Sequence, residues 1–103
     1  MFVRVDKDFN VSFEDTGDFK KFHIEVQHGQ DALGKVSEAL KAVAAVDDAE
    51  HGWVYESALR EWEGMAGDQA FQDGFSDMLE KVKPHGWYDE ERKAIQAHIE
   101  WAG

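Results

Sequence analysis

Apolar side chains occupy every second position in three runs of the first 27 residues. The runs cover residues 3–5, 9–13 and 22–26, and polar residues fill the positions between them. This alternation is typical of strands that bury one face. Turn-forming residues separate the runs at 6–8 and 15–18. We therefore predict a three-stranded antiparallel β-meander in residues 1–27, and such a sheet needs a helical layer over its apolar face.

From residue 31 the apolar spacing changes to the i, i+3, i+4 pattern of amphipathic helices. Asp31 can cap a first helix over about 31–46, and Asp68 can cap a third over about 68–83. Pro84 and Gly86 would end that third helix. We expect a single α+β domain over residues 1–103, with the sheet in 1–27. In residues 31–103, about four α-helices would pack on one face of the sheet.

The other two predicted helices rest on apolar spacing and on acidic residues near their starts. A helix over about 52–63 would place Val54, Leu59 and Trp62 on one side. A last helix from residue 89 onward would turn Ile95 and Ile99 inward. Residues 47–50 would open the first of these helices. Glu90 and Glu91 would lie in the first turn of the last one, where the helix dipole favours anions.

Composition limits the functions that the chain can have. A net charge of −11 argues against direct binding to nucleic acid or to an anionic membrane, and it favours a basic protein as the partner. The chain has no cysteine, its N-terminus does not read as a signal peptide, and it has no apolar run long enough for a membrane span. We therefore expect a cytoplasmic protein.

The negative charge is concentrated in one third of the chain. Residues 47–80 hold ten acidic residues and one basic residue, Arg60. On the predicted third helix, Asp73, Asp77 and Glu80 follow i, i+4, i+7 and form one stripe. If the second and third helices formed a hairpin, this stripe would merge with the carboxylates of the second helix. Trp53 would be an aromatic anchor beside them. The predicted partner-binding residues are Glu56, Glu63, Asp73, Asp77, Glu80 and Trp53.

Two other interpretations of these residues remain open. The acidic stripes can be ordinary solvated faces that favour solubility. Alternatively, the chain can form a homo-oligomer whose interface buries Trp53 or Trp101, or these two rings can simply pack against neighbouring elements. Mixed signs are usual on a surface selected for solubility alone, so the segregation of charge favours a docking surface.

Catalytic and cofactor motifs are absent from the sequence. His23 and Glu25 would share the polar face of one strand and His28 follows it, which is a possible three-ligand zinc site. No strained serine elbow, phosphate-binding glycine loop or calcium-loop pattern occurs. We therefore expect no enzymatic activity and no cofactor.

The sequence thus predicts a small acidic protein-binding module. In composition it resembles acidic inhibitors of basic proteins, such as nuclease immunity proteins and phage-encoded anti-CRISPR proteins, without sharing a motif with them. An inhibitor of this kind would use its acidic helical surface to occupy a basic, nucleic-acid-binding site on its partner. The alternative is a small-ligand or metal-binding domain with its site between the sheet and the helices.

Overall fold

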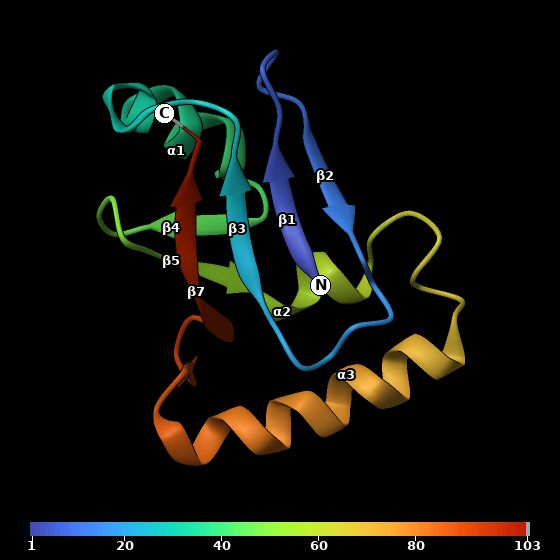
Figure 1. Cartoon of the computed structure of the whole chain (residues 1–103). Helices are drawn as coiled ribbons and strands as arrows, with labels where there is room; N and C mark the ends of the chain where they lie inside the picture. The colour runs from blue at the N-terminus through green and yellow to red at the C-terminus, as the bar shows by residue number, and fades with distance from the viewer. Residues whose placement is uncertain (103) are drawn as a thin grey trace.

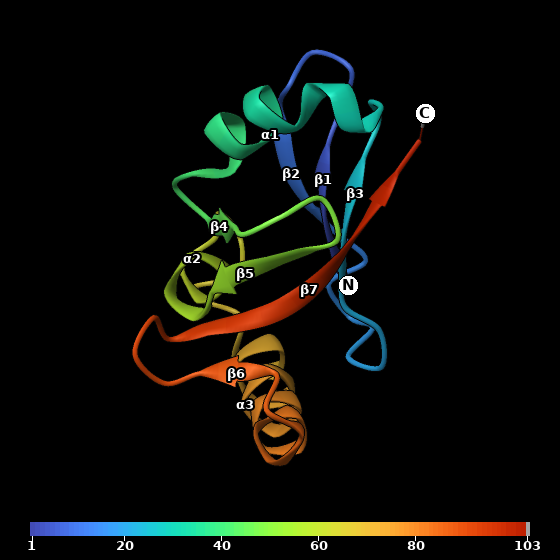
Figure 2. The ribbon, with the colours of Figure 1, turned by 90° about the vertical axis from the view of Figure 1, so that its left-hand side faces the viewer.

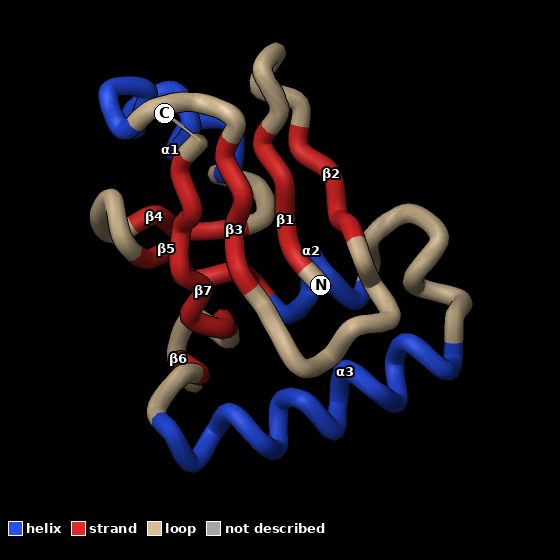
Figure 3. Tube along the Cα trace, in the orientation of Figure 1, coloured by secondary structure: helices blue, strands red, loops and turns tan. Residues whose placement is uncertain are grey.

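The computed structural model describes residues 1–102 as a curled, mixed seven-stranded sheet with three α-helices (Figures 1 and 3). The strand order is β2-β1-β3-β7-β5-β4, and the short β6 also pairs with β7. The strands are β1 Phe2–Val5, β2 Val11–Glu14, β3 His23–Val26, β4 Ala44–Val46, β5 His51–Tyr55, β6 Tyr88–Asp89 and β7 Ala94–Trp101. The helices are α1 Leu33–Leu40, α2 Glu56–Arg60 and α3 Gln69–Val82, with 3-10 turns at Gln30–Ala32 and Lys83–His85.

The predicted meander is wrong at its third strand. β1 and β2 are antiparallel neighbours, but β3 lies on the other side of β1 and runs parallel to it. The segment between β2 and β3 crosses the start of β1, where the Met1 amino group donates to the carbonyls of Asp18 (2.6 Å) and Lys21 (2.9 Å). Phe19, in the same segment, packs against Phe71 of α3. These long-range contacts, rather than the local pattern, decide on which side of β1 the third strand pairs.

The prediction of four helices after residue 31 is also wrong. Residues predicted as the second helix form β5 followed by the five-residue α2, and the predicted last helix is β7. In β7 the buried residues Ile95, Ala97 and Ile99 lie two apart, with polar residues between them. Ile95 and Ile99 are four residues apart, so they fit either period. The strand forms because β7 finds hydrogen-bonding partners along both edges.

The prediction for α3 is confirmed, whereas that for α1 is wrong in its cap and its end. Asp31 lies in the 3-10 turn and Ala32 is the N-cap residue, and Ala44–Val46, predicted as helix, form β4. α3 begins at its cap, where the Asp68 carboxylate accepts a hydrogen bond from the Phe71 N–H (3.0 Å). After the 3-10 turn, Gly86 adopts the left-handed conformation at φ 76° and ends the helical segment.

The core lies between the inner face of the curled sheet and the helices. Figure 2 shows α1 and α3 at opposite ends of this inner side, with α2 between them. Apolar residues from five strands and all three helices fill it, including Val3, Val5, Ile24, Val26, Val36, Leu40, Val54, Leu59, Phe71, Phe75, Leu79, Ile95 and Ile99. Within residues 1–102, no helix covers the opposite face of the sheet (Figure 2). The strand residues that point to that face are mostly polar.

The sheet curls because two differently oriented groups of strands share β7. One edge of β7 pairs with β5 over Ala94–His98, and residues His98–Trp101 pair with β3. Figure 1 shows β4 and β5 running across the direction of β1 and β3. On the inner side of this curl, a Cβ placed on Gly52 would lie 2.9 Å from Ile24 Cδ1 and 3.5 Å from the carbonyl oxygen of Ala45. The missing side chain therefore allows β5 to approach Ile24 of β3.

We predict that Gly52→Val destabilises the protein, because the added methyl groups would press on Ile24 in a filled core. Overpacking of this kind costs about 1–3 kcal/mol. Gly17→Val is the matched control, because a Cβ there would have no neighbour within 4 Å, and surface changes usually stay within about 0.5 kcal/mol. Denaturant unfolding of both variants gives the free energies of unfolding. Equal stability of the two variants would contradict the assigned role of Gly52.

Candidate functional site

The outward side of α3 carries three exposed carboxylates, Asp73, Asp77 and Glu80. At 100° per residue they lie on the side of the helix opposite the core residues Phe75 and Leu79. We call these three carboxylates the α3 acidic face. Their like charges repel each other at the i, i+4 spacing, by about 0.2–0.5 kcal/mol per pair in an isolated helix.

Few groups of the described chain neutralise the α3 acidic face. Lys83 Nζ lies 3.7 Å from Glu80 Oε1, and both side chains are well exposed. Asp73 accepts a hydrogen bond from the neutral amide of Gln69 (2.8 Å). Within residues 1–102, Asp77 forms no ion pair. Glu63 is exposed as well, but it lies in the segment between α2 and α3 rather than on the helix.

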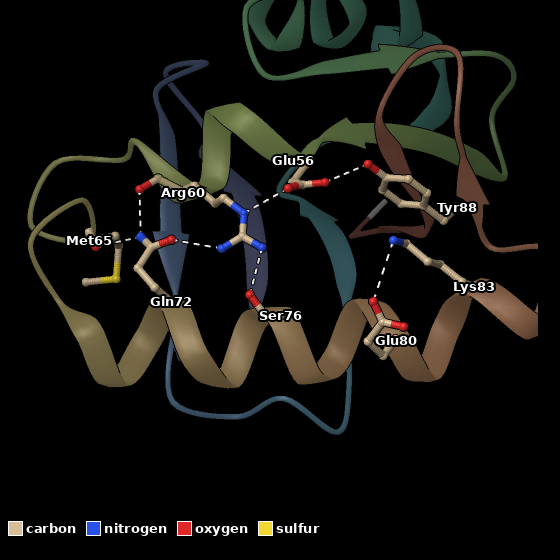
Figure 4. A network of polar contacts seen from close by, with 8 residues as sticks. All are labelled: Glu56, Arg60, Met65, Gln72, Ser76, Glu80, Lys83 and Tyr88. Atoms are coloured by element: carbon tan, nitrogen blue, oxygen red, sulfur yellow. Dashed lines mark hydrogen bonds and ion pairs between the residues drawn. The ribbon is translucent and has the colours of Figure 1, made fainter.

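Glu56 lies in a polar network instead of on an acidic surface (Figure 4). Arg60 Nε donates to Glu56 Oε2 (2.8 Å), and the Tyr88 hydroxyl donates to Glu56 Oε1 (2.6 Å). The other two guanidinium nitrogens donate to Gln72 Oε1 (2.9 Å) and Ser76 Oγ (3.0 Å) on α3. Both Glu56 and Arg60 are three-quarters buried, with 25% of each side chain exposed.

The network joins α2, α3 and β6 into one unit. The side-chain amide of Gln72 donates hydrogen bonds to the carbonyl oxygens of Arg60 and Met65, both at 2.9 Å. These bonds hold the turn between α2 and α3 together. The Arg60 guanidinium also lies over the Phe75 ring, 4.9 Å from its centroid. Each polar group thus has a partner, which is what a partly buried network needs in order to stabilise a fold.

The electrostatics of Glu56 and Tyr88 follow from these contacts. Burial alone would raise the pKa of Glu56, but the hydrogen bonds from Tyr88 and Arg60 outweigh it and hold that pKa below its ordinary value. Burial raises the pKa of Tyr88, and the bond to the Glu56 carboxylate raises it further, to about 12. The network therefore keeps Glu56 charged and Tyr88 neutral at neutral pH.

The predicted anchor Trp53 is half-buried and belongs to β5, on the face opposite the buried residues Gly52 and Val54. The Arg92 guanidinium covers its ring at 5.0 Å from the centroid. Arg92 is held there by Asp89 (2.8 Å) and Asp47 (3.2 Å). Trp101 donates its indole N–H to the Ala49 carbonyl (2.6 Å). Both rings are therefore partly covered by the chain itself and remain partly exposed.

The proposed zinc ligands do not converge. His23 stacks on Phe2 and lies 3.3 Å from Glu100, whereas Glu25 binds Arg4. His28 turns away and contacts the Asp6 carbonyl (2.9 Å). Among residues 1–102, no three His, Asp or Glu side chains are grouped closely enough to hold a metal ion.

The sequence reasoning did not find two features of the structure. The first is a row of histidines across β3, β7 and β5, in which His98 pairs with His23 on one side and His51 on the other. The second is Trp87, which is 47% exposed and is the most exposed large hydrophobic residue among residues 1–102. The triplet His-Gly-Trp occurs twice in the sequence, at residues 51–53 and 85–87, and the second copy contains Trp87. The exposure of the Trp87 side chain, however, depends on the end of α3 and the start of β7.

Comparisons with known proteins give no relative for this chain: no family model, no curated protein and no solved structure matches it. Within the described residues, no helix is both long enough and apolar enough to span a bilayer.

We predict that the Tyr88 phenol titrates near pH 12 in a Tyr55→Phe background, where Tyr88 is the one tyrosine left. Because the folded pKa lies above the ordinary value of 10, the network stabilises the fold below about pH 10. That stability is lost as the pH rises from about 10 to about 12. Ultraviolet absorbance of the phenolate gives the midpoint, and circular dichroism shows whether the fold persists.

Adding Glu56→Gln should lower this midpoint, because it removes the carboxylate that the phenol binds. Glu61→Gln is the matched control, since it removes one nearby exposed charge that does not contact Tyr88. A midpoint near 10 in the folded Tyr55→Phe protein would show that the bond between Tyr88 and Glu56 does not form.

Proposed function

We propose that the protein is a non-enzymatic protein-binding module that docks its α3 acidic face on a basic surface of a partner. A surface that normally binds nucleic acid is the best match in charge. The single observation that carries the proposal is the exposure of Asp73, Asp77 and Glu80 together, opposite the core, on one rigid helix. Figure 1 shows α3 along one end of the molecule, where a partner could reach it.

The spacing of the carboxylates along α3 supports a partner that normally binds a row of regularly spaced anions. From residue 73 to residue 80 the helix rises about 10.5 Å, which is about 5 Å per carboxylate interval. Phosphates follow one strand of duplex DNA at about 3.4 Å of axial rise. The α3 acidic face is thus a shorter and less dense row of anions of the same kind. Lys and Arg residues placed for phosphates could bind carboxylates at this spacing.

The rigidity of the surface supports binding as well. Asp68 caps α3, and Arg60 ties its side to α2 through Gln72 and Ser76. A partner would then order few groups on binding, which lowers the entropic cost of association. The Glu56 carboxylate is ion-paired and hydrogen-bonded in the same network, so it is not a free acid or base. This supports a module without catalytic activity.

We predict that Asp73→Lys/Asp77→Lys abolishes capture of a basic, nucleic-acid-binding partner. The substitutions replace two carboxylates by positive charges, which the basic surface of the partner repels. Asp8→Lys/Glu91→Lys makes the same change in net charge at two exposed positions outside α3, and it should still capture the partner. The measurement is affinity capture with mass spectrometry, followed by binding of the purified partner over a salt series. Affinity should fall steeply as salt rises.

The purified partner also gives a direct functional test. The wild-type protein and the Asp8→Lys/Glu91→Lys control should displace nucleic acid from the partner, and the α3 variant should not. If the α3 variant binds as tightly as the control, or if affinity does not respond to salt, the proposal fails.

A further inference from the structure

A small apolar pocket opens between the inner side of α3, the β2–β3 segment and the start of β7. Its volume is about 120 Å³. Six apolar residues line it: Phe19, Phe22, Met78, Val82, Trp87 and Ile95. Ile95 and Met78 are buried, Phe19, Phe22 and Val82 are half-buried, and Trp87 is exposed. The pocket therefore has an apolar interior and an exposed aromatic edge.

The remaining lining residues are Lys20, Lys21 and Gln96, and no acidic residue lines the pocket. This is unusual in a chain with 22 acidic and 11 basic residues. Both lysines are exposed. Within residues 1–102, the side-chain amide of Gln96 forms no hydrogen bond with the protein, although its backbone N–H donates to the Trp87 carbonyl (2.8 Å). Besides its apolar walls, the pocket is thus lined by two basic residues and one amide residue.

We propose that this pocket binds a small aromatic carboxylate, with the ring among the apolar residues and the carboxylate near Lys20 and Lys21. The volume decides the size of the ligand, because an engineered apolar cavity of about 150 Å³ holds one benzene molecule. At about 120 Å³ this pocket is somewhat smaller than that cavity, but it opens to solvent, so it has room for one ring whose substituent stays outside and not for a nucleotide or a larger cofactor. Apolar walls with a few placed polar groups are the usual make-up of a small-molecule site.

The charge of the pocket selects an acid over a neutral aromatic compound. The protein as a whole repels anions, so a free carboxylate binds best where lysines line a pocket and carboxylates do not. Asp18 lies near both lysines but does not line the pocket. This site is independent of the α3 acidic face, because Met78 and Val82 lie on the inner side of α3 and Asp73, Asp77 and Glu80 on the outer side. Failure of one proposal therefore leaves the other unaffected.

The test is a titration of the isotope-labelled full chain with phenylacetate, followed by NMR chemical shifts. Phenylacetate at millimolar concentration should shift the amides of residues 20–22 and the Trp87 indole in a saturable way. Benzyl alcohol, which has the same ring without the charge, should bind several-fold more weakly. Lys20→Gln/Lys21→Gln should weaken phenylacetate about three- to tenfold and leave benzyl alcohol unchanged, because exposed ion pairs contribute modestly.

Three further variants complete the experiment. Lys7→Gln/Lys35→Gln removes the same charge at exposed positions away from the pocket and should bind as the wild type does. Val82→Phe should fill the pocket and abolish binding. Trp87→Ala, at an exposed position that tolerates truncation, should weaken binding if Val82→Phe does not fold. Shifts outside the pocket, no saturation, or equal affinity for the acid and the alcohol would each overturn the proposal.

Discussion

The fold depends on the double pairing of β7. β7 pairs with β5 along its first half and with β3 along its second half. Two groups of strands with different directions therefore share this one strand. A sheet bent in this way has a concave inner side, and Ile24 and Ile99 converge there on Gly52. The bend lets a chain of 103 residues enclose a core with only three helices, two of which close the ends of the concave side.

A single arginine then decides which side of α3 is free. Arg60 is the one basic residue in 47–80, and it does not screen the carboxylates of α3. It turns toward Glu56, Gln72 and Ser76, where its charge is needed to compensate a partly buried carboxylate. The cation most able to neutralise the acidic segment is therefore used within the fold. Apart from the exposed contact between Lys83 and Glu80, this leaves the outward carboxylates to water, salt ions or a partner.

How much the sequence predicts depends on how far apart the deciding contacts lie. α3 follows from local signals, since Asp68, Gly86 and the apolar period mark its start, end and buried side, and the exposure of its acidic face follows with it. β7 does not follow, because Ile95 and Ile99 suit a helix and a strand equally and the pairing partners are distant. The parallel pairing of β3, the bond of Tyr88 to Glu56 and the pocket beside Trp87 all join segments far apart in the chain.

The two sides of α3 therefore carry opposite chemistry. The outer side is anionic and convex, with little neutralisation from the chain, and the inner side helps to line a small apolar pocket whose charged lining residues are lysines. An even distribution of the eleven basic residues would have screened the carboxylates and removed this contrast. Solubility alone does not need such separation, since mixed charges serve it equally well. Selective attraction does need it, because a partner is steered by the difference in potential between one face and the rest of the molecule.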